Sequence, residues 1–238
     1  MGTIKAIRER FNGFTQNQLK VIAAILMTAD HIGAELFPEL DILRIIGRLS
    51  LPIFAFFIYE GCKYTHSKPK YLARIFVLGL LCMAVYYIYD GKIYGNILIT
   101  MSLSICVIYA LQFFKSQIHG GNRIFGAAVA AGCICGAGIV CRIIHIDYGF
   151  CGVLLPAFAE IFGGYSSRNK HMPLLGFSIG LLLLSRQWGG DQYISLLSIP
   201  LLAAYNGERG KRKMKYFFYW FYPVHLAVIG AVSMIMGR

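Results

Sequence analysis

The segment that most constrains the fold is the apolar stretch 19–37, LKVIAAILMTADHIGAELF, which is long enough to cross a lipid bilayer. A transmembrane helix needs about 20 mostly apolar residues. This stretch nevertheless carries Asp30 and His31 well inside its apolar run. Titratable side chains at that depth are costly, and they usually face a bundle interior or a wet cavity where they find partners. The segment therefore predicts a retained first span with a proton-handling site, because it is too long and too polar for a signal peptide.

The composition of the whole chain is that of an integral membrane protein. The hydrophobic share is 57% and the mean hydropathy is +0.60. Only 14% of residues are charged, against roughly 25% in soluble domains. We predict an all-α, polytopic membrane helix bundle of about nine (8–10) transmembrane helices with a cytoplasmic N-terminus. The apolar segments are 19–37, 51–65, 72–89, 96–114, 124–141, 150–163, 172–185, 192–205 and 216–236. Three of them, 51–65, 150–163 and 192–205, are short and are expected to be tilted, broken or re-entrant.

The net charge of +12 raises the question of nucleic-acid binding, and the distribution of the charges answers it. With the N-terminus inside, 17 of the 23 Lys and Arg residues fall on the cytoplasmic side, as the positive-inside rule requires. No nucleic-acid-binding motif accompanies them. We therefore interpret the basic excess as a topology signal and expect no nucleic-acid partner. The six on the opposite side are Arg44, Arg48, Lys92, Arg142, Arg186 and Arg238.

One membrane domain accounts for most of the chain. Residues 1–18 place three apolar side chains at helical spacing beside three cations, which predicts a cytoplasmic amphipathic lead-in on the inner leaflet. No linker divides residues 19–238, which we predict to be a single transmembrane domain. The seven cysteines lack the spacing of metal ligands, so we expect packing residues and no metal.

His31 is the first candidate for catalysis. Successive helical residues lie about 100° apart, so Asp30 and His31 cannot share one face. A general base needs a partner on its second ring nitrogen, which could be Glu35, Glu60 or Asp147. The alternative is that Asp30 and His31 make interhelical hydrogen bonds that only hold the bundle together.

Two arginines follow against the positive-inside trend. Arg44 and Arg48 share one helical face with Asp41 on the extracytoplasmic side. They could bind an anionic group, or pair with Asp30 and Asp147. A solvated polar face on an interfacial helix is the alternative.

Further polar residues lie within or beside the other spans. Glu60, near the inner end of the second span, is a proton acceptor or an interhelical contact. Asn96 begins the fourth span, and Asp147 with Tyr148 lies at the outer mouth of the sixth. In the final span His225 provides a second imidazole. The alternative is that His225 only makes a hydrogen bond that stabilises the bundle.

The loop 205–215 combines a Gly-containing turn with several cations, which suits phosphate binding. Its alternative is an ordinary basic cytoplasmic loop.

A set of motifs runs nearly from end to end in a characteristic order: LKVIAAILMTADHIG (19–33), RIIGRLSLPIFAFFIYEG (44–61), NILIT (96–100), DYGFCGVLLP (147–156), LLAAYNGERG (201–210) and FYWFYPVHL (218–226). Together they resemble the TraX family of bacterial integral membrane proteins, whose namesake is associated with N-terminal acetylation of conjugative-pilus pilin. That family is similar to the membrane acyltransferase-3 superfamily, in which a membrane-embedded His beside an acidic residue is the catalytic centre. By position, the resemblance implicates His31 with Asp30 and implies acetyl-CoA as the donor.

We therefore predict an integral membrane acetyltransferase of the bacterial cytoplasmic membrane, with His31 as general base. It would move an acetyl group from cytoplasmic acetyl-CoA to an extracytoplasmic or membrane-proximal amine or hydroxyl of a pilin-like protein, glycan or lipid. The further catalytic candidates are Asp30, Glu60, Asp147 and His225, and the acceptor-binding candidates are Arg44, Arg48, Asn96 and Tyr148. The acetyl-CoA-binding candidates are Asn206, Arg209, Lys211, Arg212 and Tyr222.

Two other functions fit the same residues. In a proton-coupled transporter, Asp30, His31 and Glu60 would form a proton relay. In a non-catalytic assembly factor for a pilus or surface polymer, Asp30 and His31 would be needed for folding, and the protein would catalyse no reaction. Membrane lipids are expected partners in every case.

Overall fold

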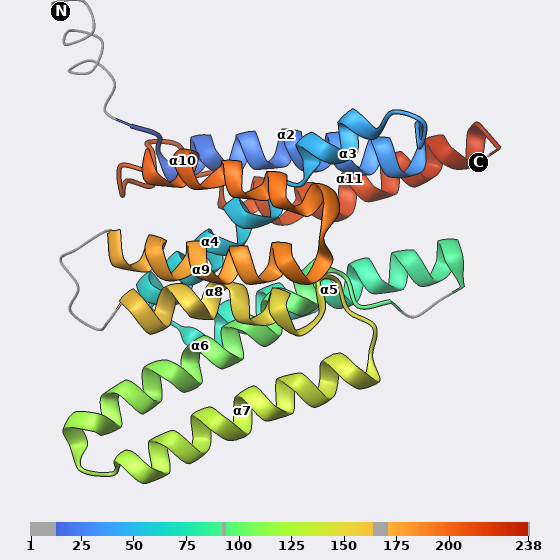
Figure 1. Cartoon of the computed structure of the whole chain (residues 1–238). Coiled ribbons are helices and arrows are strands. Elements are labelled where there is room, and N and C mark those ends of the chain that lie inside the picture. The colour runs from blue at the N-terminus through green and yellow to red at the C-terminus, as the bar shows by residue number, and fades with distance from the viewer. Residues whose placement is uncertain (1–12, 92–93, 164–170, 238) are drawn as a thin grey trace, which may run out of the picture.

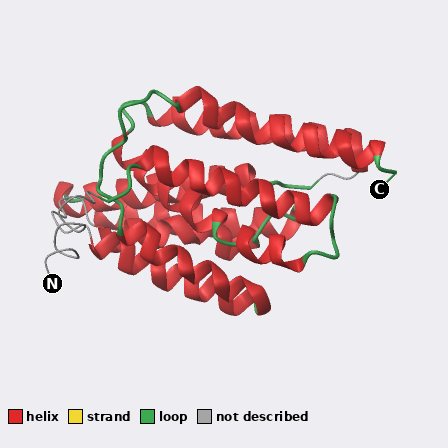
Figure 2. Ribbon diagram, turned by 90° about the horizontal axis from the view of Figure 1, so that it is seen from above, coloured by secondary structure: helices red, strands yellow, loops and turns green. Residues whose placement is uncertain are grey.

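The computed structural model describes residues 13–91, 94–163 and 171–237, and most of the predicted lead-in 1–18 lies outside them. These residues form helices and no strand, which confirms the predicted all-α bundle (Figures 1 and 2). The α-helices are α2 (Gln16–Glu35), α3 (Asp41–Gly47), α4 (Ser50–Tyr64), α5 (Lys68–Asp90), α6 (Ile97–Gly120), α7 (Arg123–Ile143), α8 (Gly149–Gly163), α9 (His171–Trp188), α10 (Ser198–Ala203) and α11 (Lys215–Ile235), with a 3₁₀-helix η1 (Gly190–Leu197) before α10.

The described helices run back and forth along one axis (Figure 1). Among the described residues, five helical segments are long and apolar enough to cross a membrane. They are Asp41–Tyr64, Lys68–Ile88, Ile97–Ile118, Arg123–Ile143 and Tyr216–Ile235. The chain is therefore a multi-pass membrane protein. The predicted segment 192–205 is broken into η1 and α10, in agreement with its short length.

Helix α4 occupies the centre of the bundle. Ten of its 15 residues are buried, among them Phe57 and Tyr59. It packs against α2, α6 and α8, while α8 packs closely against α9. By contrast, only 17% of the most apolar window of α5, and of α7, is buried. Both helices therefore turn most of their apolar side chains toward lipid.

The two ends of the bundle differ in charge. Helices α2, α5 and α11 begin, and α4 ends, at one end, which we call the basic end (Figure 1). The cations Lys20, Lys63, Lys70, Arg74 and Arg209 lie there. The positive-inside rule predicts that this end faces the cytoplasm. Asp30, Arg44, Arg48, Asp147 and Trp188 lie toward the opposite end, which we call the distal end.

Candidate functional site

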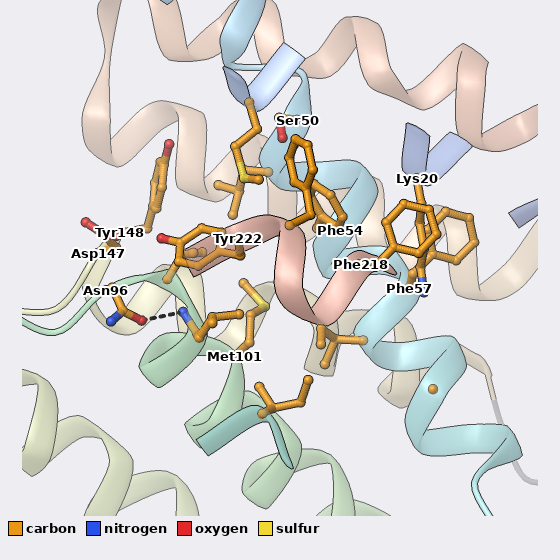
Figure 3. Close-up of a pocket in the computed structure, with 18 of the residues that line it drawn as sticks. Lys20, Ser50, Phe54, Phe57, Asn96, Met101, Asp147, Tyr148, Phe218 and Tyr222 are labelled. Carbon is orange, nitrogen blue, oxygen red and sulfur yellow. Dashed lines mark hydrogen bonds between the residues drawn. The ribbon is translucent and has the colours of Figure 1, made fainter. Parts of the chain in front are cut away.

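A cavity of about 1210 Å³ extends along the bundle from the basic end to the distal end. Its walls come from α2, α3, α4, α5 and α11, from the start of α6, from the end of α9 with η1, and from several of the joining loops. Figure 3 shows Lys20, Phe57 and Phe218 toward one side of the close-up, and Asn96, Asp147 and Tyr148 toward the other. Tyr222 lies between the two groups. Ligand sites in proteins usually enclose about 300–1,000 Å³, so this cavity has room for an elongated ligand.

The mouth of the cavity at the basic end is strongly cationic. The Lys20 ammonium lies over the rings of Phe57 and Phe218, at 5.4 and 5.7 Å from their centroids. These cation–π contacts hold the charge at the wall of the cavity. The Tyr205 hydroxyl lies 3.5 Å from Glu60 Oε2 in the same region. The cations that line this part are Lys20, Lys70, Arg74 and Arg209.

The loop that carries Arg209 is held against the start of α2. The N–H of Gln16 donates to the Glu208 carbonyl at 2.8 Å, and the N–H of Asn17 donates to the Arg209 carbonyl at 3.2 Å. Both bonds satisfy N–H groups that the first turn of a helix leaves unpaired. Of the four residues that the sequence predicts in this loop, Arg209 lines the cavity, whereas Asn206, Lys211 and Arg212 lie outside its lining.

A pair of histidines joins α2, which carries the predicted first span but is not among the five segments above, to α11. His31 Nδ1 and His225 Nε2 are 3.0 Å apart. His225 Nδ1 lies 2.9 Å from the Phe221 carbonyl oxygen, which can only accept, so this nitrogen carries a proton. In a neutral imidazole the other nitrogen is then an acceptor. His225 Nε2 therefore accepts a hydrogen bond from His31 Nδ1, and His31 Nε2 keeps its lone pair.

This pairing differs from the sequence-based expectation. The partner of the second nitrogen of His31 was predicted to be Glu35, Glu60 or Asp147, and it is an imidazole instead. His31 lines the cavity, whereas His225 is 8% exposed and lies behind it. A general base needs a fixed tautomer with a free lone pair toward the substrate. The histidine pair fixes the tautomer of His31 and leaves the lone pair on its Nε2.

Asp30 lies close to the two arginines, as the sequence predicts. Its Oδ1 atom is 3.8 Å from Arg44 Nη1. Arg48 Nη1 donates to the Tyr148 hydroxyl at 3.4 Å. A Cβ at Gly47 would collide with Asp30, so the glycine allows α3 to approach α2 at this point. The structure therefore gathers charged groups from both helices and from the loop before α8 at the distal end of the cavity.

Asp147, in the loop between α7 and α8, is partly buried. Burial raises the pKa of its carboxyl to about 6, against a lowering influence from hydrogen bonds with the Tyr94 side chain and the Ile97 backbone. Its backbone carbonyl accepts a hydrogen bond from Thr100 Oγ1 at 2.8 Å. Asp147 lines the cavity and is also tied into the loops that close the distal end.

Asn96 has a structural role. Its Oδ1 caps α6 by accepting from the N–H of Leu98 at 3.0 Å and of Ile99 at 3.4 Å (Figure 3). Its Nδ2 donates to the Gly79 carbonyl at 2.8 Å. An N-cap asparagine is a common way to satisfy a helix start. Asn96 was predicted to bind substrate, but its side chain is engaged with these backbone groups although it lines the cavity.

Two residues at the distal end were not found from the sequence. Trp188 lies beside Tyr148, with ring centroids 5.7 Å apart. Gln192, at the start of η1, is 5% exposed, and its Nε2 has no hydrogen-bond partner within the described structure. Gly189 and Gly190, both at positive φ, turn the chain between them. A tryptophan followed by two glycines between apolar segments is the signal that could have indicated this corner.

Comparison with known protein families shows to which family the chain belongs. A sequence profile described as TraX protein matches residues 15–233. The chain belongs to the TraX family. The resemblance drawn from the motifs is thereby confirmed.

Two proteins from other bacteria are similar to this chain in sequence. The probable fimbrial assembly protein FimC, serogroup H1, of Dichelobacter nodosus is 28% identical over 252 residues, which cover 94% of this chain and 97% of that protein. The uncharacterized protein RP591 of Rickettsia prowazekii (strain Madrid E) is 41% identical over 105 residues, which cover 43% of this chain and 39% of that protein. No solved structure matches the chain.

Proposed function

We propose that the protein is an acetyltransferase of the bacterial cytoplasmic membrane that moves an acetyl group from cytoplasmic acetyl-CoA to an acceptor near the opposite surface. The observation that carries this proposal is one continuous cavity that joins a cationic mouth to His31. The donor is made inside the cell, and an elongated cofactor that reached through this cavity would bring its thioester to the distal half of the bundle.

The donor would enter at the basic end. Phosphate groups pair well with lysine and arginine, and four such side chains, Lys20, Lys70, Arg74 and Arg209, line the mouth. This set replaces most of the predicted loop cations as our assignment for the CoA phosphates. The cavity beyond the mouth is lined by aromatic and aliphatic side chains such as Phe54, which suit a pantetheine arm.

The chemistry would take place at His31. We assign its Nε2 as the base that takes a proton from the acceptor hydroxyl or amine. The acceptor atom then attacks the thioester carbon, the C–S bond breaks, and the proton passes from His31 to the departing thiolate. His225 would hold the tautomer and share the positive charge of the intermediate imidazolium. Arg44 would stabilise the negative charge that develops on the thioester oxygen.

A second candidate has its own support. The similarity to a probable fimbrial assembly protein favours a non-catalytic factor in pilus assembly. Such a factor has no need of a cavity that joins a cationic mouth to a histidine with a free lone pair. For this reason we prefer the enzyme.

The proposal is tested by the release of CoA thiol from acetyl-CoA, with purified protein in phosphatidylcholine vesicles. Removing a positioned base costs about 10²–10⁴-fold in rate. The rate of thiol release by His31→Ala should therefore be at least about 10²-fold below that of wild type. His145→Ala, which removes an exposed imidazole from the loop after α7, is the matched control and should behave like wild type. Equal rates for wild type and His31→Ala would refute the assignment. If wild type neither releases thiol nor binds acetyl-CoA, the assembly factor becomes the better description.

A further inference from the structure

Three buried polar atoms at the distal end of the cavity have no hydrogen-bond partner within the described structure. They are Asp30 Oδ1, Arg48 Nε and Gln192 Nε2. All three residues line the cavity, and they come from α2, from the end of α3 and from η1. Buried polar groups in native proteins are nearly always paired. Asp30 Oδ1 faces Arg44 Nη1 at 3.8 Å, an ion pair too long to be a hydrogen bond. The three atoms therefore still lack hydrogen bonds, which points to a ligand that supplies them.

The chemistry of these atoms limits what the ligand is. Arg48 Nε and Gln192 Nε2 can only donate, whereas the Asp30 carboxylate can only accept. A hydroxyl group both donates and accepts, so a ligand with several hydroxyls satisfies all three atoms. An ammonium group has donors only, and it would leave Arg48 and Gln192 unpaired while it faced two guanidinium groups. Of the other carboxylates that line this end, Asp147 is hydrogen-bonded in its loop, Asp191 is exposed, and Glu35 is half-buried.

An aromatic surface lies beside the unpaired atoms. Tyr148 and Trp188 have ring centroids 5.7 Å apart, and Trp188 is 54% exposed. Tyr148 has a φ of 60°, a left-handed backbone that a bulky residue rarely adopts. Such strain persists where the surroundings hold the residue in place, often at a ligand site. Here the Arg48 hydrogen bond and the Trp188 ring hold the phenol at the cavity wall.

We propose that this corner is the acceptor subsite and that the acceptor is a sugar residue, whose hydroxyls bind Asp30, Arg48 and Gln192 while its apolar ring face packs on Tyr148 and Trp188. The inference rests on the proposed function. One sugar hydroxyl gives its proton to His31 Nε2 and forms the new C–O ester bond. The acetyl C–S bond breaks, and the CoA thiolate receives that proton. The reaction is O-acetylation, with acetyl-CoA as the acyl donor.

The test uses direct binding and turnover on the same samples. The chain contains two tryptophans, so Trp220→Phe leaves Trp188 as the sole tryptophan, and selective excitation of tryptophan reports on it alone. This variant, in phosphatidylcholine nanodiscs free of sugar detergents, is titrated with the methyl glycosides of glucose, galactose and N-acetylglucosamine, and with the tripeptide amide Ala-Ala-Ala-NH₂. Thiol release from acetyl-CoA is measured with and without each probe. We expect at least one glycoside to shift the Trp188 emission and to accelerate thiol release, and the tripeptide to do neither.

Variants then locate the subsite. Gln192→Leu removes the amide at nearly constant volume and should raise the KM for the effective glycoside about tenfold, with a much smaller change in kcat. Gln187→Leu makes the same chemical change at an exposed position of α9 and should match wild type. Trp188→Leu, at an exposed side chain whose loss leaves the core intact, should raise the same KM and serves if Gln192→Leu does not fold.

The outcomes separate the two proposals. Thiol release without any response to a glycoside refutes the sugar subsite and leaves the enzyme standing, and a response to the tripeptide alone does the same and assigns an amine acceptor. Absence of both thiol release and acetyl-CoA binding refutes the enzyme. The fluorescence titration needs no turnover, so it decides on sugar binding in that case as well.

Discussion

The histidine pair makes a quantitative prediction for His225. In His225→Leu the N–H at His31 Nδ1 loses its acceptor at 3.0 Å while it stays buried. An unsatisfied buried donor costs about 1–3 kcal/mol. The imidazole of His31 can avoid that cost by moving its proton to Nε2, which removes the lone pair that the proposed base needs. We therefore expect kcat for thiol release to fall about 10–100-fold, because each 1.4 kcal/mol is a factor of ten.

The informative companion is His225→Gln. The amide group of glutamine occupies nearly the position of the imidazole Nε2, and its carbonyl oxygen accepts the His31 hydrogen bond. It loses the bond from His225 Nδ1 to the Phe221 carbonyl, so some loss of stability is expected in both variants. Thiol release should nevertheless recover to within about threefold to tenfold of wild type in His225→Gln. Both proteins are compared at matched size-exclusion profiles and thermal midpoints. Equal rates for the leucine and glutamine variants, or a wild-type rate in His225→Leu, would refute the positioning role.

Three further predictions concern the rest of the cavity. Lys20→Met should weaken acetyl-CoA binding about tenfold or more in calorimetry because a charge-assisted phosphate contact is lost, whereas Lys63→Met, at an exposed residue of the same end, should not; equal losses would place the phosphates elsewhere. Gly47→Ala should lower the thermal midpoint, because the new Cβ collides with Asp30 and overpacking costs about 1–3 kcal/mol; an unchanged midpoint would show that α3 can move away. The pKa of Asp147 is raised from 3.8 to about 6, so its burial favours the folded state below pH 4 and this contribution is lost as pH rises through 6. The stability of Asp147→Asn relative to wild type should therefore increase by about 2 kcal/mol between pH 4 and pH 8, and a pH-independent difference in thermal midpoints would contradict this.

The fold was predictable because membrane helices are governed by one strong constraint. Backbone groups in lipid must be paired within a helix, so apolar length alone locates a span such as 96–114 or 124–141. The division of the second span was not predictable in the same way. Helix α3 ends at Gly47 and α4 begins at Ser50, and at this boundary Gly47 lies against Asp30 of α2, which is a tertiary contact.

The candidate site was predictable where a titratable residue stands inside an apolar segment, because such residues are rare there. Asp30 and His31 inside an apolar run, and the nearby Arg44, were found for that reason, and the Asp30–Arg44 pair forms. The partner of His31 lies 194 residues away in the sequence. No local sequence pattern can predict a contact over that separation. Gln192 escaped notice because a polar residue beside a Trp-Gly-Gly sequence is unremarkable until its burial is known.

The contact between His31 and His225 also has a consequence for how the protein is made. Helices α2 and α11 meet at this bond, so the two imidazoles cannot pair until α11 has been synthesised and has packed against α2. Until then the nascent bundle holds His31 without its final partner, and the cavity lacks the wall that α11 provides. The site is therefore completed only when α11 joins the bundle, and we expect a chain cut before α11 to lack both the His31 partner and this part of the cavity wall.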